Sequence, residues 1–136
     1  MAQGETTASA TAEGVLGGSR AYSGFSTNDL ARAKAFYGQT LGVEVTEEHG
    51  LLHLHLAGGG KVLIYPKPSH RPAEFTVLNF PVENVEEAVD RLVRAGIKFE
   101  RYEGMPQDER GILREQGPPI AWFKDPAGNI LSVHKG

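Results

Sequence analysis

Cysteine is absent from this chain of 136 residues. Its absence excludes disulfide bonds, thiolate catalysis and zinc or iron–sulfur centres built on cysteine, and it leaves the redox compartment unmarked. Any bound metal ion would need histidine, aspartate, glutamate or tyrosine as its ligands.

Excess positive charge and long apolar runs are also missing. The 14 Lys and Arg residues against 17 Asp and Glu give a net charge of −3, so the composition predicts no basic face for nucleic acid or anionic lipid. No window approaches the roughly 18 apolar residues of a membrane span, and the first twenty residues lack the basic and apolar regions of a secretory leader. We therefore expect a cytoplasmic protein whose partners include neither nucleic acid nor a membrane.

Turn-forming residues are abundant, with 17 Gly and 8 Pro, which favours a fold with much β-sheet. Residues 1–19 hold too few apolar groups to offset the entropy of ordering them, so we expect a flexible arm there. One domain should occupy residues 20–136. A proline-rich linker, 67–73, divides it into a first module of about 20–66 and a second of about 74–136.

The two modules repeat one pattern, seen in "GFSTNDLARAKAFYGQTLGVEV" (24–45) and "NFPVENVEEAVDRLVRAGIKFE" (79–100). Each copy contains an N-cap residue, Asp29 or Asn84, then apolar residues at helical spacing and a closing glycine. The apolar positions predict two buried helical faces: Leu30, Ala33, Tyr37 and Leu41, and Val85, Ala88, Leu92 and Ala95.

Three strand-like runs follow each predicted helix. They cover 43–48, 51–56 and 60–66 in the first module, and 97–103, about 118–124 and 129–134 in the second. The sequence thus predicts an α+β fold of two βαβββ modules that form a curved mixed sheet around a concave pocket, with the helices on the other face.

This arrangement resembles the vicinal oxygen chelate superfamily of glyoxalases, extradiol dioxygenases, and fosfomycin and bleomycin resistance proteins. The resemblance covers about residues 20–135 and is carried by "NDLARAKAFYGQTLG", "PVENVEEAVDRLVRAG" and "WFKDPAGNILSV", which look like the family's two helices and closing hairpin. It implies the paired-module fold and, for a chain of this length, a homodimer. It implies no single reaction, because one fold here serves many chemistries.

Metal-dependent members of the superfamily hold their ion with four His or Glu ligands, one on the first and one on the last strand of each module. Carried onto this chain, those positions are Tyr22, Ile64, Val77 and Ser132. Apolar side chains offer no lone pair, and neutral Ser and Tyr are poor ligands for such divalent ions. A slip from Ile64 to Leu63 or Tyr65 would not change this. The resemblance therefore implies that the usual metal site is missing, and we predict no cofactor.

The run "LLHLHL" (51–56) raises an alternative. On a strand its even-numbered leucines would face the helices, while His53 and His55 would face the pocket together with Ser132 and His134. The two histidines could be relocated ligands for Fe, Mn, Zn or Ni, or one could act as a general base. A His-x-His pair is also a common pattern on the solvated face of a strand.

The predicted pocket is apolar with a few polar groups, as small-molecule sites usually are. Trp122 is either a core side chain or an aromatic wall for a planar ligand, and Asn79 is either a ligand contact or a satisfied structural amide. The expected pocket residues are Tyr22, His53, His55, Ile64, Val77, Asn79, Trp122, Ser132 and His134.

Two features are assigned to the surface. His49 and His70 lie in turns and are expected in solvent. The polar run 102–119 is longer than most connections, which suits either a lid over the pocket or a surface loop whose charges cancel in water.

These observations favour a glyoxalase- or bleomycin-resistance-like protein that binds or sequesters a small organic molecule as a homodimer. Two alternatives stay open. One is a lyase, isomerase or dioxygenase that uses His53 and His55, and the other is a protein-interaction or regulatory module.

Overall fold

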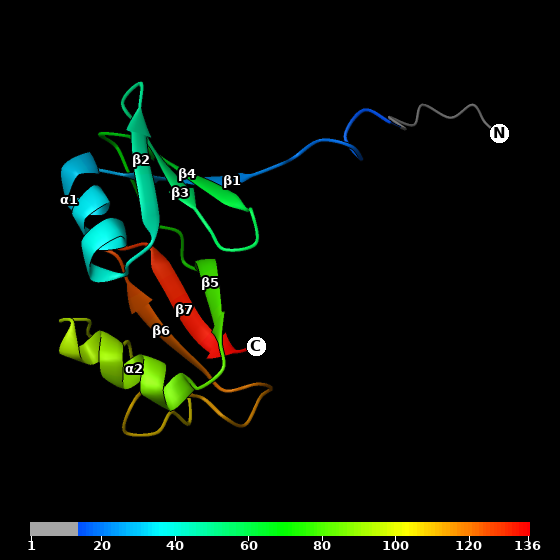
Figure 1. The fold of residues 1–136 in the computed structure, drawn as a ribbon. Helices are drawn as coiled ribbons and strands as arrows, with labels where there is room; N and C mark the ends of the chain where they lie inside the picture. The colour runs from blue at the N-terminus through cyan, green and yellow to red at the C-terminus, as the bar shows by residue number, and fades with distance from the viewer. Residues whose placement is uncertain (1–13) are drawn as a thin grey trace.

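The computed structural model describes residues 14–136, which form two modules with both helices on the same side of the strands (Figure 1). Residues 1–13, most of the expected arm, lie outside the described part. The N-terminal module contains β1 (Ser23–Thr27), α1 (Leu30–Ala35), the π-helical turn η1 (Phe36–Thr40), β2 (Glu44–Glu48), β3 (Leu51–His55) and β4 (Lys61–Pro66).

Hydrogen bonding orders the N-terminal sheet as β1-β4-β3-β2. β1 runs parallel to β4, and β3 pairs antiparallel with both β4 and β2. Leu52 lies opposite Ile64, and His53 lies opposite Leu63. Because directly opposed residues share a face of the sheet, Leu52 and Ile64 lie on one face and His53 and Leu63 on the other.

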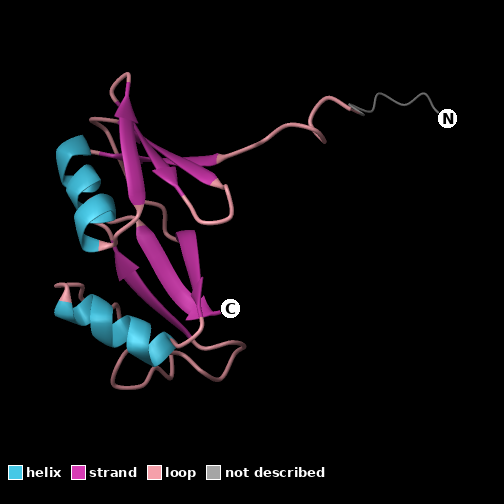
Figure 2. Cartoon of the chain, in the orientation of Figure 1, coloured by secondary structure: helices cyan, strands magenta, loops and turns pink. Residues whose placement is uncertain are grey.

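The C-terminal module contains β5 (Thr76–Val82), α2 (Val85–Arg94), β6 (Ile120–Lys124) and β7 (Ile130–Lys135). Its sheet has the order β5-β7-β6, with β5 parallel and β6 antiparallel to β7. This repeats the β1-β4-β3 arrangement of the first module (Figure 2). The α+β architecture of two similar modules is therefore confirmed, with the strands divided between two hydrogen-bonded sheets.

The strand predicted over 97–103 is wrong, since only Phe99 makes an isolated bridge, to Phe123. The reason lies in the side chain of Gln107. Its amide nitrogen donates to the carbonyl of Glu100 at 3.0 Å, and its carbonyl oxygen accepts from the N–H of Tyr102 at 2.8 Å. Backbone groups that a neighbouring strand would have used are thus satisfied by one side chain.

Both helices begin at the predicted caps. Asp29 accepts a hydrogen bond from the backbone N–H of Arg32 at 3.0 Å, and Asn84 accepts one from Glu87 at 2.9 Å. The glycines that close the two helical segments have φ values of 75° and 98°, a conformation that glycine adopts at little cost.

The core lies between the helices and the sheets. Ala33, Tyr37 and Val85 are buried as the helical pattern predicts. The predicted face of α2 needs one correction, because Val89 is 1% exposed whereas Ala95 is exposed. No helix within residues 14–136 has the length and apolar character needed to cross a bilayer.

Candidate functional site

The side of the two sheets opposite the helices is called the open face below. On β3, Leu52 and Leu54 are fully buried toward α1, while His53 and His55 are half-buried on the open face. The predicted alternation is confirmed. The Nε2 atom of His55 lies 2.8 Å from Thr46 Oγ1 on β2, so the neighbouring strand already provides one polar partner for this ring.

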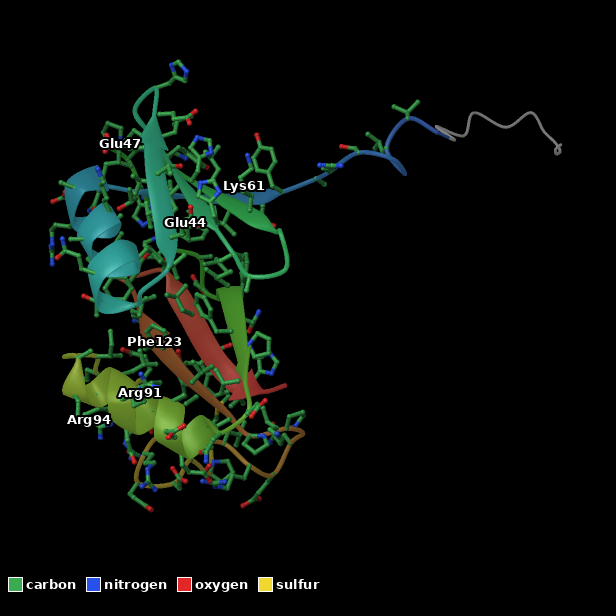
Figure 3. All side chains as sticks on the ribbon, in the orientation of Figure 1. Glu44, Glu47, Lys61, Arg91, Arg94 and Phe123 are labelled. Carbon is green, nitrogen blue, oxygen red and sulfur yellow. The ribbon has the colours of Figure 1, made fainter. Side chains whose placement is uncertain are left out.

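The histidine pair has no third ligand beside it in the described part of the chain. Within residues 14–136, no three His, Asp or Glu side chains gather in a way that could hold a metal ion. The register places Glu44 on one side of His55 and Lys61 on the other (Figure 3). The Lys61 ammonium group would oppose a cation bound at His55. The donor set on this strand therefore does not fit a divalent metal.

Ile64 requires a correction. It is 0% exposed and packs in the core, on the helix side of β4, so it does not face the pocket. Leu63 occupies the open face instead. Ser132 lies opposite Trp122 as Leu63 lies opposite His53, which makes Leu63 the true counterpart of Ser132 in the repeat. Like isoleucine, leucine offers no metal ligand.

The other three family positions also lack ligands of the usual kind. Tyr22 precedes β1 and is 62% exposed. Val77 sits where the register between β5 and β7 shifts. Ser132 is fully buried, and its hydroxyl donates to Asn79 Oδ1 at 2.5 Å. The side-chain oxygen of Asn79 is thus used in a structural hydrogen bond, which favours the structural interpretation of this residue over a ligand contact.

A hollow of about 490 Å³ lies beside Trp122 on the open face of the C-terminal sheet. The indole N–H of Trp122 donates to Thr76 Oγ1 at 3.1 Å, and the Tyr102 ring meets the indole edge-on with a centroid separation of 5.7 Å. The indole is thus fixed from two directions. The residues that line the hollow are Met105, Leu113, Gln116, Pro118, Ile120, Trp122 and His134.

His134 contributes an imidazole ring, with its hydrogen-bonding nitrogens, to the lining of this hollow. Its Nδ1 atom lies 3.0 Å from the carbonyl oxygen of Lys135. A carbonyl can only accept, so this hydrogen bond requires the proton on Nδ1 and leaves Nε2 as the acceptor of that tautomer. No carboxylate or cationic side chain of Lys or Arg lines the hollow. It is suited to an uncharged, planar molecule that carries a hydrogen-bond donor.

The run 102–119 is fastened to the domain, which corrects the expectation that its charges cancel in water. Arg110 forms a bidentate pair with Asp90 of α2, with distances of 2.9 and 3.2 Å. Arg114 lies 2.7 Å from Glu86 and 3.1 Å from Asp108. Ile112 is fully buried in the core. The run is therefore a packed part of the C-terminal module and forms one wall of the hollow.

The arginines of this run lower the pKa values of nearby carboxylates on α2 and in the run itself. The hydrogen bond from Arg110 lowers the pKa of Asp90, and the hydrogen bond from Arg114 lowers the pKa of Glu86. Burial opposes ionisation of Asp108, but backbone N–H groups and Arg114 outweigh it and hold its pKa below the usual range. All three carboxylates stay ionised at neutral pH, which keeps the loop attached.

A buried polar cluster joins the two modules. Asp125 Oδ2 accepts hydrogen bonds from the Tyr37 hydroxyl at 2.7 Å and the Asn129 amide at 2.9 Å. Asn129 also donates to the carbonyl of Ser26 at 3.0 Å. Burial, together with the Asp125 carboxylate, raises the pKa of Tyr37 far above its ordinary value. The cluster connects η1, β1 and the turn before β7.

His70 belongs to the same junction, so its assignment to solvent is corrected. Its Nδ1 atom lies 2.6 Å from Ser26 Oγ, and its Nε2 atom lies 3.0 Å from the carbonyl of Ala127. The ring therefore ties the linker to both modules. Sequence reasoning missed this cluster because "DPAGN" was interpreted only as a turn. The signal that could have found it is the carboxylate of Asp125 and the amide of Asn129, which lie directly next to the strands β6 and β7.

Of the predicted pocket residues, the structure brings Trp122 and His134 together in the hollow and bonds Asn79 to Ser132. His53 and His55 belong to the other sheet and are not part of the hollow's lining. The remaining lining residues, Met105, Leu113, Gln116 and Pro118, come from the long run and Ile120 from β6. Charged residues separate these positions in the sequence, so the pattern of the run does not indicate which of its side chains line a pocket.

The repeated modules and their shared open face define a class of α+β proteins built from paired βαβββ units. The family model of the Glyoxalase/Bleomycin resistance protein/Dioxygenase superfamily matches residues 21–133. The chain belongs to this superfamily, and the resemblance noted in the sequence is confirmed. No curated protein sequence matches the chain significantly.

Solved structures show the same fold. A glyoxalase family protein from Enterococcus faecalis is 26% identical, with 83% of this chain and 93% of that chain covered and a TM-score of 0.61. The fosfomycin resistance protein FosX from Listeria monocytogenes is 18% identical, with 85% and 91% covered and a TM-score of 0.65. A superfamily member from Sphaerobacter thermophilus is 20% identical, with 85% and 95% covered and a TM-score of 0.65.

Proposed function

We propose that the protein binds or sequesters a small, planar, uncharged organic molecule in the hollow beside Trp122. The observation that carries this proposal is the fixed indole in an apolar hollow with a single histidine acceptor. Aromatic walls hold planar ligands by offset stacking or edge contacts. The volume of about 490 Å³ falls within the range of roughly 300–1,000 Å³ typical of small-molecule sites. A phenol is the simplest ligand of this chemistry.

The proposal is supported by the absence of family-type ligands at Tyr22, Leu63, Val77 and Ser132. An enzyme that relies on His53 and His55 remains the alternative proposal. The nearby Lys61, and the lack of a third ligand within residues 14–136, give it less support. Metal content after dialysis against Fe, Mn, Zn and Ni tests it. Stoichiometric metal that is lost in His53→Ala would favour the enzyme, and trace metal throughout would favour simple binding.

Trp122 is the only tryptophan in the chain, so its fluorescence reports directly on the hollow. We expect substituted phenols to quench it saturably and to raise the melting temperature. His134→Phe removes the imidazole acceptor and should weaken phenol binding about three- to tenfold, the effect of one neutral hydrogen bond. The matching methyl ethers, which lack the donor, should bind the variant and the parent protein alike.

Met105→Arg should block the hollow, since Met105 lines it and is 40% exposed. Val93→Arg is the control, because Val93 is 52% exposed on α2 and does not line the hollow. Equal binding by both variants, or no response to any aromatic ligand, would contradict the proposed site.

We also propose a homodimer formed through the free edges of the sheets. β1 and β5 are edge strands with one unpaired side within the described chain. Exposed aromatic residues lie next to these edges, with Tyr22 at 62% before β1 and Phe75 at 69% before β5. Edge strands flanked by apolar groups are stabilised by pairing. A monomer in sedimentation equilibrium at micromolar concentration would contradict the dimer.

A further inference from the structure

A second cavity lies on the helix side of the molecule, between the end of η1, one face of α2 and the core face of the C-terminal sheet. Its volume is about 460 Å³, again within the range of ligand sites. We call it the helix cleft. Its apolar walls include Leu41, Phe80, Val82 and Leu92, with the small side chains of Ala88 and Ala95 on α2.

Arg91 is the only charged residue that lines the helix cleft. Figure 3 labels it on α2, with Phe123 on the neighbouring strand β6. No carboxylate within residues 14–136 forms an ion pair with it at 4.0 Å or less. The acidic neighbours Glu86 and Asp90 on α2 are already paired with arginines of the long run. Glu87, one turn before Arg91 on α2, forms no ion pair with it either. The helix cleft therefore combines apolar walls with one cation that takes part in no ion pair of the described residues.

We propose that the helix cleft binds an amphipathic monoanion, namely a medium-length acyl chain whose carboxylate pairs with Arg91. The Thr40 hydroxyl, also in the lining, can donate to the second carboxylate oxygen. The acyl chain would cover Phe80 and Val82, which are only half-buried in the free chain. Burial of such surface is favourable in proportion to its area.

The charge of Arg91 decides between an anionic and a neutral ligand. The C-terminal ends of η1 and α2 both border the helix cleft, and helix C-termini carry partial negative charge. Without Arg91, this field would disfavour a carboxylate. The ligand preference should therefore reverse when Arg91 loses its charge.

The helix cleft is separate from the hollow beside Trp122. Phe123 lines the cleft, whereas Trp122 lines the hollow, and adjacent residues on a strand point to opposite faces of a sheet. Occupation of one site does not need the other. The inference is thus independent of the function proposed above.

Isothermal titration calorimetry with octanoate, decanoate and decanol tests the proposal. We expect one decanoate per chain, bound about tenfold more tightly than octanoate because two more methylene groups are buried. Decanol should bind less tightly than decanoate. Arg91→Gln should weaken decanoate binding about three- to fivefold, the range of an exposed ion pair, and should make decanol the better ligand.

Arg94→Gln is the matched control, because Arg94 has the same charge on the same helix and does not line the helix cleft. Ala95→Phe fills the cleft from an exposed position and should abolish binding of all three compounds. Phenol titrations of Trp122 should be unchanged by saturating decanoate. The proposal is overturned if decanoate does not bind, if the two arginine variants weaken it equally, or if decanol binds the parent protein as well as decanoate.

Discussion

The two modules share one repeated pattern but complete their sheets differently. In the N-terminal module, β2 adds a fourth strand that hydrogen-bonds along β3. In the C-terminal module only two isolated bridges reach β6, from Phe99 to Phe123 and from Leu113 to Ile120. The long run between them is held mainly by side chains such as Gln107, Asp108 and Arg110. The repeated core of helix and strands is thus completed by a fourth strand in one module and by a loop held by side chains in the other.

This difference determines which of the two sheets carries the candidate site. The open face of the N-terminal sheet carries His53, His55 and Lys61, which lie half-buried or exposed. The open face of the C-terminal sheet carries an apolar hollow, because the long run contributes Met105 and Leu113 as walls. The module that departs from the repeat is the one that carries the hollow and, with it, the proposed ligand site.

The largest expected effect comes from breaking the junction between the modules. Asp125 is 5% exposed and accepts hydrogen bonds from Tyr37, Asn129 and two backbone N–H groups. Asp125→Ala leaves these donors without an acceptor and should lower the free energy of unfolding by about 3–5 kcal/mol in urea titrations. Asp108→Ala, at a more exposed carboxylate of the long run, should cost about 1 kcal/mol, because water can replace part of its hydrogen bonding. Equal losses would contradict the central role of Asp125.

The second prediction compares the cores of the two modules. Ile112 in the long run and Leu54 on β3 are both 0% exposed. Replacing either one by alanine should cost about 2–4 kcal/mol, as for other large buried aliphatic residues. Urea unfolding of both variants measures this. A loss below about 0.5 kcal/mol for Ile112→Ala alone would mean that the run is a loosely attached lid.

The third prediction concerns pH. Tyr37→Phe removes one hydrogen bond to Asp125 and should cost about 1–2 kcal/mol at neutral pH. Because the pKa of Tyr37 is raised in the folded state, the unfolded chain ionises first, above about pH 10. This contribution is complete below pH 10 and is lost at about 1.4 kcal/mol per pH unit above it.

Urea unfolding between pH 8 and pH 11 measures that slope. The alkaline loss should be smaller in Tyr37→Phe than in the parent chain. Tyr65→Phe is the control, since Tyr65 is 39% exposed and should leave the slope nearly unchanged. Parallel slopes for the parent protein and Tyr37→Phe would show that the phenol ionises without unfolding.

The smallest effect is expected at the ion pairs. Arg110→Ala should hardly change global stability, since surface pairs contribute little, but should speed hydrogen exchange at the Ile112 amide several-fold. Lys34→Ala, which removes the exposed Lys34–Glu47 pair of the N-terminal module, should leave exchange in β2 unchanged because backbone pairing holds that strand. The Arg110 hydrogen bond lowers the pKa of Asp90. The Arg110–Asp90 ion pair therefore persists at neutral pH and is lost only below about pH 4.

Local chemistry made much of the fold predictable. Asp29 and Asn84 act as caps, and the alternation of Leu and His on β3 orients that strand as expected. These features depend on neighbours within a few residues, where periodicity and hydrogen-bonding capacity are informative. The register of β4 was harder. A shift of one residue separates Ile64 from Leu63 and moves a position to the opposite face.

The site was less predictable because its contacts join distant segments. Trp122 and His134 were expected at the pocket, and both line the hollow. The run 102–119 was left open between a lid over the pocket and a surface loop, because Gln107 replaces a strand with side-chain hydrogen bonds that leave no periodic signature. The roles of Asp125 and His70 depend on partners more than 40 residues away.

The junction at Asp125 also bears on the order in which the chain folds. Tyr37 finds its acceptor 88 residues later, and Asn129 reaches back across 103 residues to Ser26. Contacts of such long range slow folding, because large loops must close before they form. As the chain emerges from the ribosome, the first module has all its strands while its buried phenol still lacks an acceptor. Synthesis of the last hairpin is therefore the step that completes the module made first.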